Sequence, residues 1–432
     1  MVALVIALAL FFDFTNGFHD TANAMATPIA TGAIKPKTAV TLAALLNLVG
    51  AFLSTEVAKT VSGGIIREGS GASPITPEII FAGLMGAILW NMITWLKGLP
   101  SSSSHALFGG LIGAAIVGIG FNSINLESLL QKVILPAIFA PLIAGLVAYV
   151  CTRLAYALTS RHDPETGSKL TQKRGGFRTG QIFTSSLVAL AHGTNDAQKT
   201  MGIITLVLIA AGTQAPGTGP QFWVIAACAL AIAIGTYSGG WRIIRTMGSG
   251  LTEVKPAQGF AAETSTASAI LASSHLGFAL STTQVASGSV IGSGMGRKGT
   301  TVRWNMVGKI AIGWLFTLPA AGIVGALTAL LVSTGVVGVL IAAIAGTGAV
   351  LFMFFYSRKS AVGHHNAVEV EEAGQAVRFA KKKAMARARA EAKAKAKAEA
   401  SATANARPQA EPEPQSQAPA DADATNSKET QR

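Results

Sequence analysis

The stretch GFHDTANA, residues 17–24, returns in altered form as GTNDAQKT, residues 193–200. Asp196 follows Asp20 by 176 positions, and both copies interrupt strongly apolar sequence. Each copy therefore carries a carboxylate and carboxamides into apolar surroundings. An ionisable side chain inside a membrane is costly and marks a functional site by default. We expect the two copies to interrupt their helices and to form the functional centre.

The surrounding composition predicts a membrane protein. Half of the residues are hydrophobic and only 13% are charged. Residues 38–55, 221–240 and 335–356 carry no charge, and about 20 such residues span a bilayer core. The apolar run at residues 2–12 lacks a basic leader, so we expect a retained helix rather than a signal peptide. The two cysteines, Cys151 and Cys228, show neither a disulfide framework nor metal-ligand spacing.

The basic residues predict how the chain is oriented. They gather at Lys35 and Lys37, in the loop 159–179, at 242–255, at 297–303 and after 358. The positive-inside rule places these clusters in the cytoplasm. We therefore expect a multi-pass protein of the plasma membrane with its N-terminus outside and its C-terminus in the cytoplasm.

This orientation forces two hairpins. Segments 79–96 and 106–121 have both outer flanks on the external side, and segments 259–274 and 285–295 have both on the cytoplasmic side. Each pair is therefore expected to enter the membrane and return to its own side. Irregular backbone at the polar tips is tolerated only where protein buries it or it lines a watery cavity.

The hairpin tips repeat as well. Residues 102–105, SSSH, match residues 281–284, STTQ, at an offset of 179. Two motifs repeated in one order indicate a duplication, and the charge pattern gives the copies opposite topologies, as in many secondary transporters. We predict an all-α polytopic membrane protein with two inverted-topology repeats, discontinuous helices and two re-entrant helical hairpins. The predicted parts are a first repeat at 1–158, a basic cytoplasmic linker at 159–179, a second repeat with an extra span at 180–357, and a cytoplasmic tail at 358–432.

The tips have the chemistry of an anion site. Each hydroxyl cluster directly precedes an apolar helix, whose N-terminus offers free N–H groups and a positive dipole end. The hydroxyls could also simply cap these helices. The candidate anion-binding residues are Ser102, Ser103, Ser104, Ser281, Thr282 and Thr283.

The duplicated motif has the chemistry of a cation or proton site, because carboxylate and carboxamide oxygens suit a hard cation. The same groups could instead lock the repeat interface through mutual hydrogen bonds. The candidate coupling residues are Asp20, Asn23, Asn195, Asp196 and Gln198. Accessory candidates are Asn16, His19, His105, Gln284, Lys199, for which we expect a structural ion pair, and Glu263, which is either a coupling carboxylate or a buried partner.

These motifs resemble those of the inorganic phosphate transporter (Pit) family over residues 1–357. The segments 12–24 and 191–202 are similar to its two signatures, and those around 102–109 and 281–288 to its hairpin tips. The match is closest to the bacterial low-affinity branch, which has histidine at the position of His19, where the sodium-coupled branch typically has asparagine. The resemblance implies symport of phosphate, free or as a neutral metal complex, with H⁺ or Na⁺. It assigns phosphate to the hydroxyl residues and the cation to the coupling residues given above.

The sequence therefore predicts a secondary active transporter that imports inorganic phosphate by cation symport, with a proton favoured and sodium open. It is not expected to be an enzyme or to use a cofactor. A transporter of another tetrahedral oxyanion such as sulfate is the alternative, and an intramembrane serine hydrolase is a distant one, since adjacent Ser104 and His105 suit nucleophile and base poorly. A passive channel would show no uphill accumulation. The expected partners are phosphate and the lipid bilayer, and the sequence does not decide whether the protein forms a homo-oligomer.

The tail differs from the rest of the chain. Residues 376–400 are rich in Ala, Lys, Arg and Glu, which are good helix formers. They lack the apolar stripe that a core needs, and the end of the chain is predicted to be disordered. We interpret the basic run as a solvated cytoplasmic tail rather than a surface for anionic lipid or nucleic acid.

Overall fold

The computed structural model describes residues 1–63, 75–160, 176–358 and 362–363. The regular secondary structure of these residues is helical, with no strand among them. The all-α prediction is confirmed. The predictions for the linker fall largely, and those for the tail almost wholly, outside the described residues. The first half contains α1 (Val2–Ala30), α2 (Pro36–Gly50), α3 (Glu56–Gly63), α4 (Pro77–Leu96), α5 (Ser103–Gly118), α6 (Leu126–Leu129) and α7 (Leu135–Ser160). The second contains α9 (Gly176–Ala210), α10 (Phe222–Ser238), α11 (Trp241–Arg245), α12 (Pro256–His275), α13 (Thr282–Gly296), α14 (Trp304–Val332) and α15 (Val336–Ser357).

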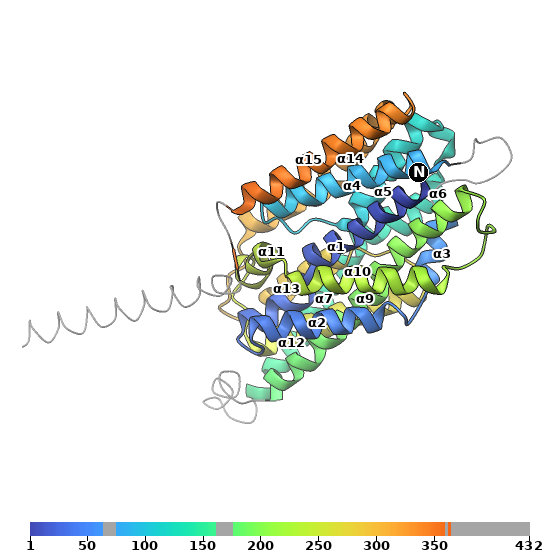
Figure 1. The fold of residues 1–432 in the computed structure, drawn as a ribbon. Helices are drawn as coiled ribbons and strands as arrows, with labels where there is room; N and C mark the ends of the chain where they lie inside the picture. Colours follow the sequence, from blue (N-terminus) through green and yellow to red (C-terminus); the bar gives the residue numbers. More distant parts are fainter. Residues whose placement is uncertain (64–74, 161–175, 359–361, 364–432) are drawn as a thin grey trace, which may run out of the picture. The chain divides into compact units, whose positions relative to one another are not determined.

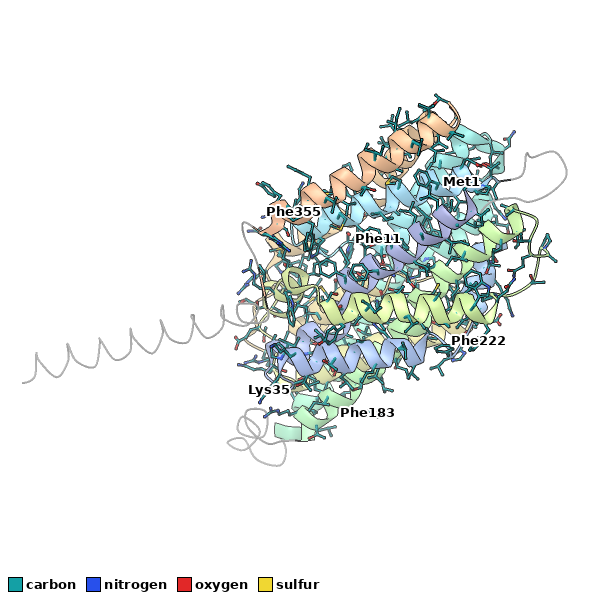
Figure 2. All side chains as sticks on the ribbon, viewed as in Figure 1. Met1, Phe11, Lys35, Phe183, Phe222 and Phe355 are labelled. Carbon is teal, nitrogen blue, oxygen red and sulfur yellow. The ribbon has the colours of Figure 1, made fainter. Side chains whose placement is uncertain are left out.

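Several helices are long and apolar enough to cross a membrane. Within the described residues these are α1, α4, the stretch Leu126–Leu158, α14 and α15, with a sixth if α10 and the bent segment Trp241–Gly250 count as one span. Figure 1 shows α15 lying along α4 at one side of the described helices. Large apolar side chains such as Phe183, Phe222 and Phe355 lie exposed on the outer helix faces (Figure 2). Such extensive apolar exposure fits a lipid-facing surface.

The predicted span at 38–55 is only partly formed. Helix α2 ends at Gly50 after 15 residues, about 22 Å at 1.5 Å per residue. The chain then turns, and α3 begins at Glu56. Gln198 on α9 fixes this start, because its Oε1 accepts hydrogen bonds from the backbone N–H of Val57 (2.7 Å) and Ala58 (3.3 Å). A side chain from the second half therefore determines where a helix of the first half begins.

The expectation that the repeated motif breaks its helices is wrong. Helices α1 and α9 run unbroken through both copies. The polar side chains find partners without unwinding the backbone: Thr21 Oγ1 donates to the Gly17 carbonyl at 2.6 Å, and Gln198 Nε2 donates to the Thr194 carbonyl at 2.5 Å. The irregular turns lie elsewhere, in the π-helical segments Leu130–Ile134 and Thr246–Gly250 and in a 59° bend after α10.

Both hairpins are present and are built alike. The first arm of each, α4 or α12, ends at a glycine with positive φ, Gly98 at 64° and Gly277 at 73°. Glycine adopts this left-handed conformation at no steric cost, which ends the helix and turns the chain. The second arms, α5 and α13, begin at the capping residues Ser102 and Ser281.

The two halves also pack through matching contacts with exchanged partners. A Cβ on Gly113 of α5 would lie 1.9 Å from the carbonyl oxygen of Gly322 on α14. A Cβ on Gly292 of α13 would lie 1.9 Å from the carbonyl oxygen of Gly145 on α7. Each hairpin thus packs its second arm, backbone against backbone, on a long helix of the other half. Helix α1 packs on α10 and α9 packs on α2 in the same exchanged manner.

This packing predicts that alanine at Gly113 or Gly292 is destabilising, because the opposing carbonyl belongs to the backbone of another helix and cannot rotate away. We expect each substitution to lower the free energy of unfolding by about 1–3 kcal/mol, measured by chemical denaturation in detergent micelles. Gly313→Ala is the matched control, since a Cβ there meets nothing within 4 Å. Equal tolerance at all three positions would contradict the close packing.

Candidate functional site

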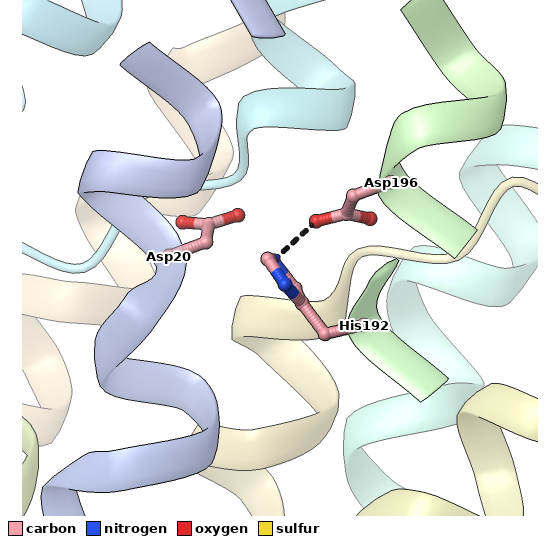
Figure 3. A group of neighbouring side chains, drawn as sticks. All are labelled: Asp20, His192 and Asp196. Carbon is pink, nitrogen blue, oxygen red and sulfur yellow. Dashed lines mark ion pairs between the residues drawn. The ribbon is translucent and has the colours of Figure 1, made fainter. Parts of the chain in front are cut away.

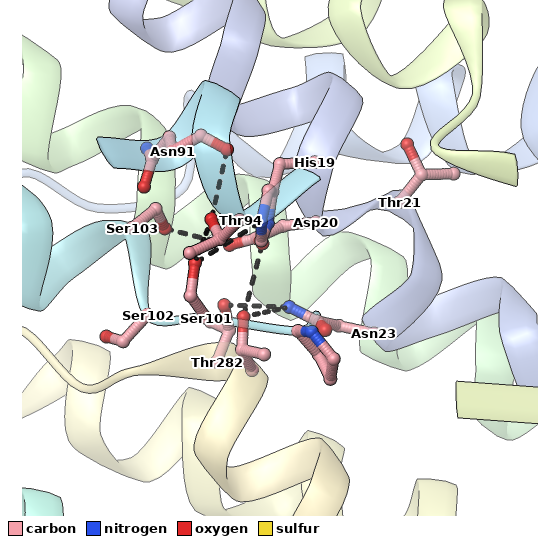
Figure 4. Close-up of polar contacts among 12 residues, drawn as sticks. His19, Asp20, Thr21, Asn23, Asn91, Thr94, Ser101, Ser102, Ser103 and Thr282 are labelled. Carbon is pink, nitrogen blue, oxygen red and sulfur yellow. Dashed lines mark hydrogen bonds and ion pairs between the residues drawn. The ribbon is translucent and has the colours of Figure 1, made fainter. Parts of the chain in front are cut away.

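Asp20 of α1 joins the two hairpin tips. Its carboxylate accepts a hydrogen bond from Ser103 Oγ of the first tip at 2.8 Å and from Thr283 Oγ1 of the second tip at 3.2 Å (Figure 4). His19 lies beside it, with 2.6 Å between His19 Nδ1 and Asp20 Oδ1. The Asp20 side chain is 1% exposed. One buried carboxylate thus contacts tips that lie about 180 positions apart in the sequence.

Asn23 lies one turn further along the same face of α1. Its Nδ2 donates to Thr282 Oγ1 at 3.2 Å and to Thr283 Oγ1 at 3.1 Å. Thr282 in turn donates to Asp196 Oδ2 at 3.0 Å. The second tip therefore links the two copies of the repeated motif through a continuous hydrogen-bond chain.

Asp196 of α9 is paired with a lysine and a histidine of its own helix. Lys199 Nζ donates to its Oδ1, and His192 Nε2 lies 2.9 Å from its Oδ2 (Figure 3). Lys199 also donates to the Leu280 carbonyl oxygen at 2.9 Å. The expected ion pair of Lys199 is present, and it also ties α9 to the second tip.

The two tips meet each other directly. Ser104 Oγ of the first tip donates to the Leu280 carbonyl of the second at 3.2 Å. The capping role foreseen for the tip hydroxyls holds for two of the six residues: Ser102 Oγ accepts from the His105 N–H at 3.2 Å, and Ser281 Oγ accepts from the Gln284 N–H at 3.3 Å. Ser103, Ser104, Thr282 and Thr283 instead make contacts between elements.

The central side chains form a potential cation site. Ligand atoms of Asp20, His192 and Asp196 lie within 4.8 Å of one another, and all three side chains are buried. Asp20 and Asp196 contribute two carboxylates to this cluster, and the Lys199 ammonium group, which bonds Asp196, contributes one positive charge. If both carboxylates are ionised and the histidines are neutral, the cluster carries one net negative charge. Binding one monovalent cation or one proton would neutralise it.

Several candidates lie apart from this cluster. Gln198 is engaged at the start of α3, and Asn195 Nδ2 donates to Ser274 Oγ of α12 at 3.0 Å. His105 is buried in α5 near Val133. Asn16 and the Gln284 Oε1 atom are buried without a hydrogen-bond partner.

Glu263 forms a second polar centre of its own. Its carboxylate accepts hydrogen bonds from Thr27 Oγ1 at 2.6 Å, Gln181 Nε2 at 3.0 Å and Thr184 Oγ1 at 2.7 Å. These partners come from α1 and α9, whereas Glu263 lies on the first arm of the second hairpin. Glu263 therefore has the buried-partner surroundings that we considered, and a coupling role stays a prediction.

Sequence reasoning missed three contributors. His192 is absent from the candidate residues given above, although it aligns with Asn16 at the offset of 176. The repeat itself could have identified it. Ser101, whose Oγ lies 3.4 Å from His19 Nε2 and 2.7 Å from Thr94 Oγ1, precedes the matched tip. The Leu280 carbonyl is a backbone group, so no side-chain pattern could have signalled it.

An all-helical fold with several apolar spans around a buried polar centre is typical of multi-pass membrane transporters. The model of the phosphate transporter family matches residues 16–325, and the chain belongs to this family. A probable low-affinity inorganic phosphate transporter of Mycobacterium tuberculosis is 55% identical over 329 residues, 76% of each chain. One of Bacillus subtilis is 40% identical over 334 residues, 76% of this chain and 96% of the relative.

A solved structure supports the fold. The structure titled "The sodium-dependent phosphate transporter" matches with a TM-score of 0.67 at 23% identity, covering 77% of this chain and 99% of the other. The chain is thus a multi-pass membrane protein of a transporter family whose named relatives are transporters rather than enzymes. The expectation of a phosphate transporter, and not a hydrolase, is confirmed at the level of the family.

Removing the buried ammonium group tests the electrostatics of the site. Lys199→Met leaves Asp196 without its cationic partner, and we expect the free energy of unfolding in detergent to fall by about 3–5 kcal/mol. The control Lys59→Met breaks an exposed lysine–glutamate pair of the same sequence spacing, with Glu56, and should cost less than about 1 kcal/mol. Similar small losses in both variants would contradict a buried, tightly paired Lys199.

Proposed function

We propose that this protein imports inorganic phosphate across the plasma membrane by cation-coupled symport, with a proton as the favoured coupling ion. The observation that carries the proposal is the convergence of both hairpin tips on two buried carboxylates. Asp20 receives hydrogen bonds from Ser103 and Thr283, and Asp196 receives one from Thr282. The relatives named as low-affinity inorganic phosphate transporters support the same substrate.

The tips supply neutral donors for phosphate. Helices α5 and α13 begin at the tips, and the first N–H groups of a helix have no partner inside it. Those groups and the positive dipole ends favour an anion. We assign phosphate binding to Ser102, Ser103, Ser104, Ser281, Thr282 and Thr283. Because hydroxyl and amide donors carry no full charge, they can release the anion again, as transport requires.

The carboxylates supply the coupling function. Phosphate brought beside Asp20 and Asp196 meets like charge, so a proton or sodium ion bound there makes joint passage cheaper. Asn23 belongs to this group because it bonds both threonines of the second tip. Asn195 and Gln198 contribute indirectly, because their amides form hydrogen bonds that hold α12 and α3 in place. His19, whose Nδ1 lies 2.6 Å from Asp20 Oδ1, offers ring nitrogens that can donate or accept a hydrogen bond, which favours the proton.

Access to the site requires a conformational change, because Asp20, Asp196 and the tip hydroxyls are all buried. The matched contacts between the halves support a duplicated architecture that rocks between outward-open and inward-open states. We propose the inverted orientation with the N-terminus outside and the C-terminus in the cytoplasm. Opening one hairpin away from Asp20 while the other stays bonded would expose the site to one side at a time.

Neutralising each central aspartate tests the coupling role. In proteoliposomes, Asp20→Asn and Asp196→Asn should each lower phosphate uptake driven by a pH gradient by about 100-fold, comparable to losing one strong hydrogen bond to a charged group. Uptake is measured with and without sodium and with and without the pH gradient. Wild-type uptake in both variants would remove the aspartates from the mechanism.

Competition with sulfate separates phosphate from its closest chemical rival. Phosphate keeps a proton near pH 7 and can donate a hydrogen bond to Asp20 or Asp196, whereas sulfate can only accept. We expect a large excess of sulfate to leave uptake of labelled phosphate unchanged, while unlabelled phosphate suppresses it. Equal suppression by sulfate would favour a general oxyanion transporter.

A further inference from the structure

The second aspartate of α1, Asp13, has no role in the mechanism described so far. Asp13 precedes Asp20 by two helical turns and is 0% exposed. Neither of its carboxylate oxygens makes a hydrogen bond of standard geometry. Asn16, one turn further along, is also 0% exposed, and both its amide nitrogen and its amide oxygen lack partners. Four unsatisfied polar atoms therefore lie on one face of a buried helix.

Helix α9 adds a fifth such atom. The Thr200 side chain interacts with the Asp13 carboxylate, but its buried hydroxyl makes no hydrogen bond of standard geometry. Thr200 lies one turn beyond Asp196 on α9, on the same face. The titratable or charged groups that face Asp13 from the packed helices are Asp196 and Lys199 on α9 and Cys228 on α10.

Structural pairing does not explain this carboxylate. The Lys199 ammonium group is directed to Asp196 and to the Leu280 carbonyl. An ionised carboxylate left without a partner in a dry interior costs several kcal/mol, so such groups are usually paired, neutralised or functional. The second half has alanine, Ala189, at the matching position 176 residues later. Asp13 is therefore an addition to one half and not a requirement of the repeated fold.

We propose that Asp13 is a proton-binding residue of the transport cycle, separate from the central carboxylates and supported by Asn16 and Thr200. The proposal rests on the proposed function, proton-coupled phosphate uptake. A proton suits this site better than sodium because an amide and a hydroxyl each offer both a donor and an acceptor. They can satisfy Asp13 as a carboxyl group, which donates, and as a carboxylate, which accepts.

The position of the site gives it a place in the cycle. Moving from Asp20 towards the start of α1 leads to Asp13, and moving from Asp196 towards the end of α9 leads to Thr200. Asp13 and Thr200 therefore lie on the same side of the central cluster of Asp20, His192 and Asp196. Under the proposed orientation this is the external side of the membrane. A proton from the external water would form an O–H bond on Asp13 before phosphate enters. That bond breaks again when the proton leaves for the cytoplasm.

We would test this proposal with the reconstituted protein, comparing wild type with Asp13→Asn and Asp13→Glu. The control variant is Thr205→Val, which removes another buried hydroxyl of α9 that lacks a hydrogen-bond partner. Phosphate exchange at equal pH is compared with uptake driven by one pH unit. We expect Asp13→Asn to keep exchange but to lose gradient-driven stimulation, about tenfold for one coupled proton. Asp13→Glu should retain the stimulation, and Thr205→Val should match wild type. Unchanged stimulation, with an unchanged proton-to-phosphate ratio, in Asp13→Asn would overturn the proposal.

If Asp13→Asn transports no phosphate, a second measurement tests the proposal. We would record infrared difference spectra of the same preparations between acidic and neutral pH. A protonated-carboxyl band that disappears in Asp13→Asn, or shifts in Asp13→Glu, supports the site, and a band unaffected in both overturns it. If Asp13→Asn loses only the stimulation of phosphate uptake by sodium and keeps the stimulation by a pH gradient, the choice of a proton as the bound ion is overturned. If wild type accumulates no phosphate under any ion gradient, the proposed function fails, whereas the band still reports on Asp13.

Discussion

The hydrogen bonds that Asp20 accepts from both hairpin tips are the interaction on which the rest of the structure depends. A carboxylate at this depth needs partners, and Ser103 and Thr283 supply them from the starts of two helices. Those helices must therefore reach the middle of the protein. The backbone contacts of α5 on α14 and of α13 on α7 hold them there, which is why glycines rather than larger residues occupy the crossing points.

Much of this architecture follows from the sequence because it leaves repeated signals. The offsets of 176 and 179 relate the aspartates and the tips, and the positive-φ glycines and capping serines repeat at the same spacing. What the sequence does not carry is the direction of each side chain. The carboxamide of Gln198 has the composition of a cation ligand, yet it starts helix α3 in the other half. Likewise, the sequence shows that α1 and α9 carry polar residues, but not that Thr21 and Gln198 bond carbonyls of their own helices and leave the backbone unbroken.

The likeness of the halves makes their differences informative. At matching positions His19 stands opposite Asn195, Asn16 opposite His192, and Asn23 opposite Lys199. In consequence Asp196 is paired with a lysine and a histidine of its own helix, whereas Asp20 depends on the tips and on His19. Asp20 therefore receives hydrogen bonds from both tips, whereas Asp196 receives one, from Thr282 of the second tip.

The central claim is that both tips serve one shared phosphate site. Equilibrium binding of labelled phosphate to the purified protein tests it most directly, comparing wild type with Ser103→Ala in the first tip and Thr283→Val in the second. A shared site predicts one phosphate per chain and a weaker affinity, by about tenfold, in either variant. Two phosphates per chain, or variants that each remove only half of the binding, would show that the tips form separate sites and would contradict the account.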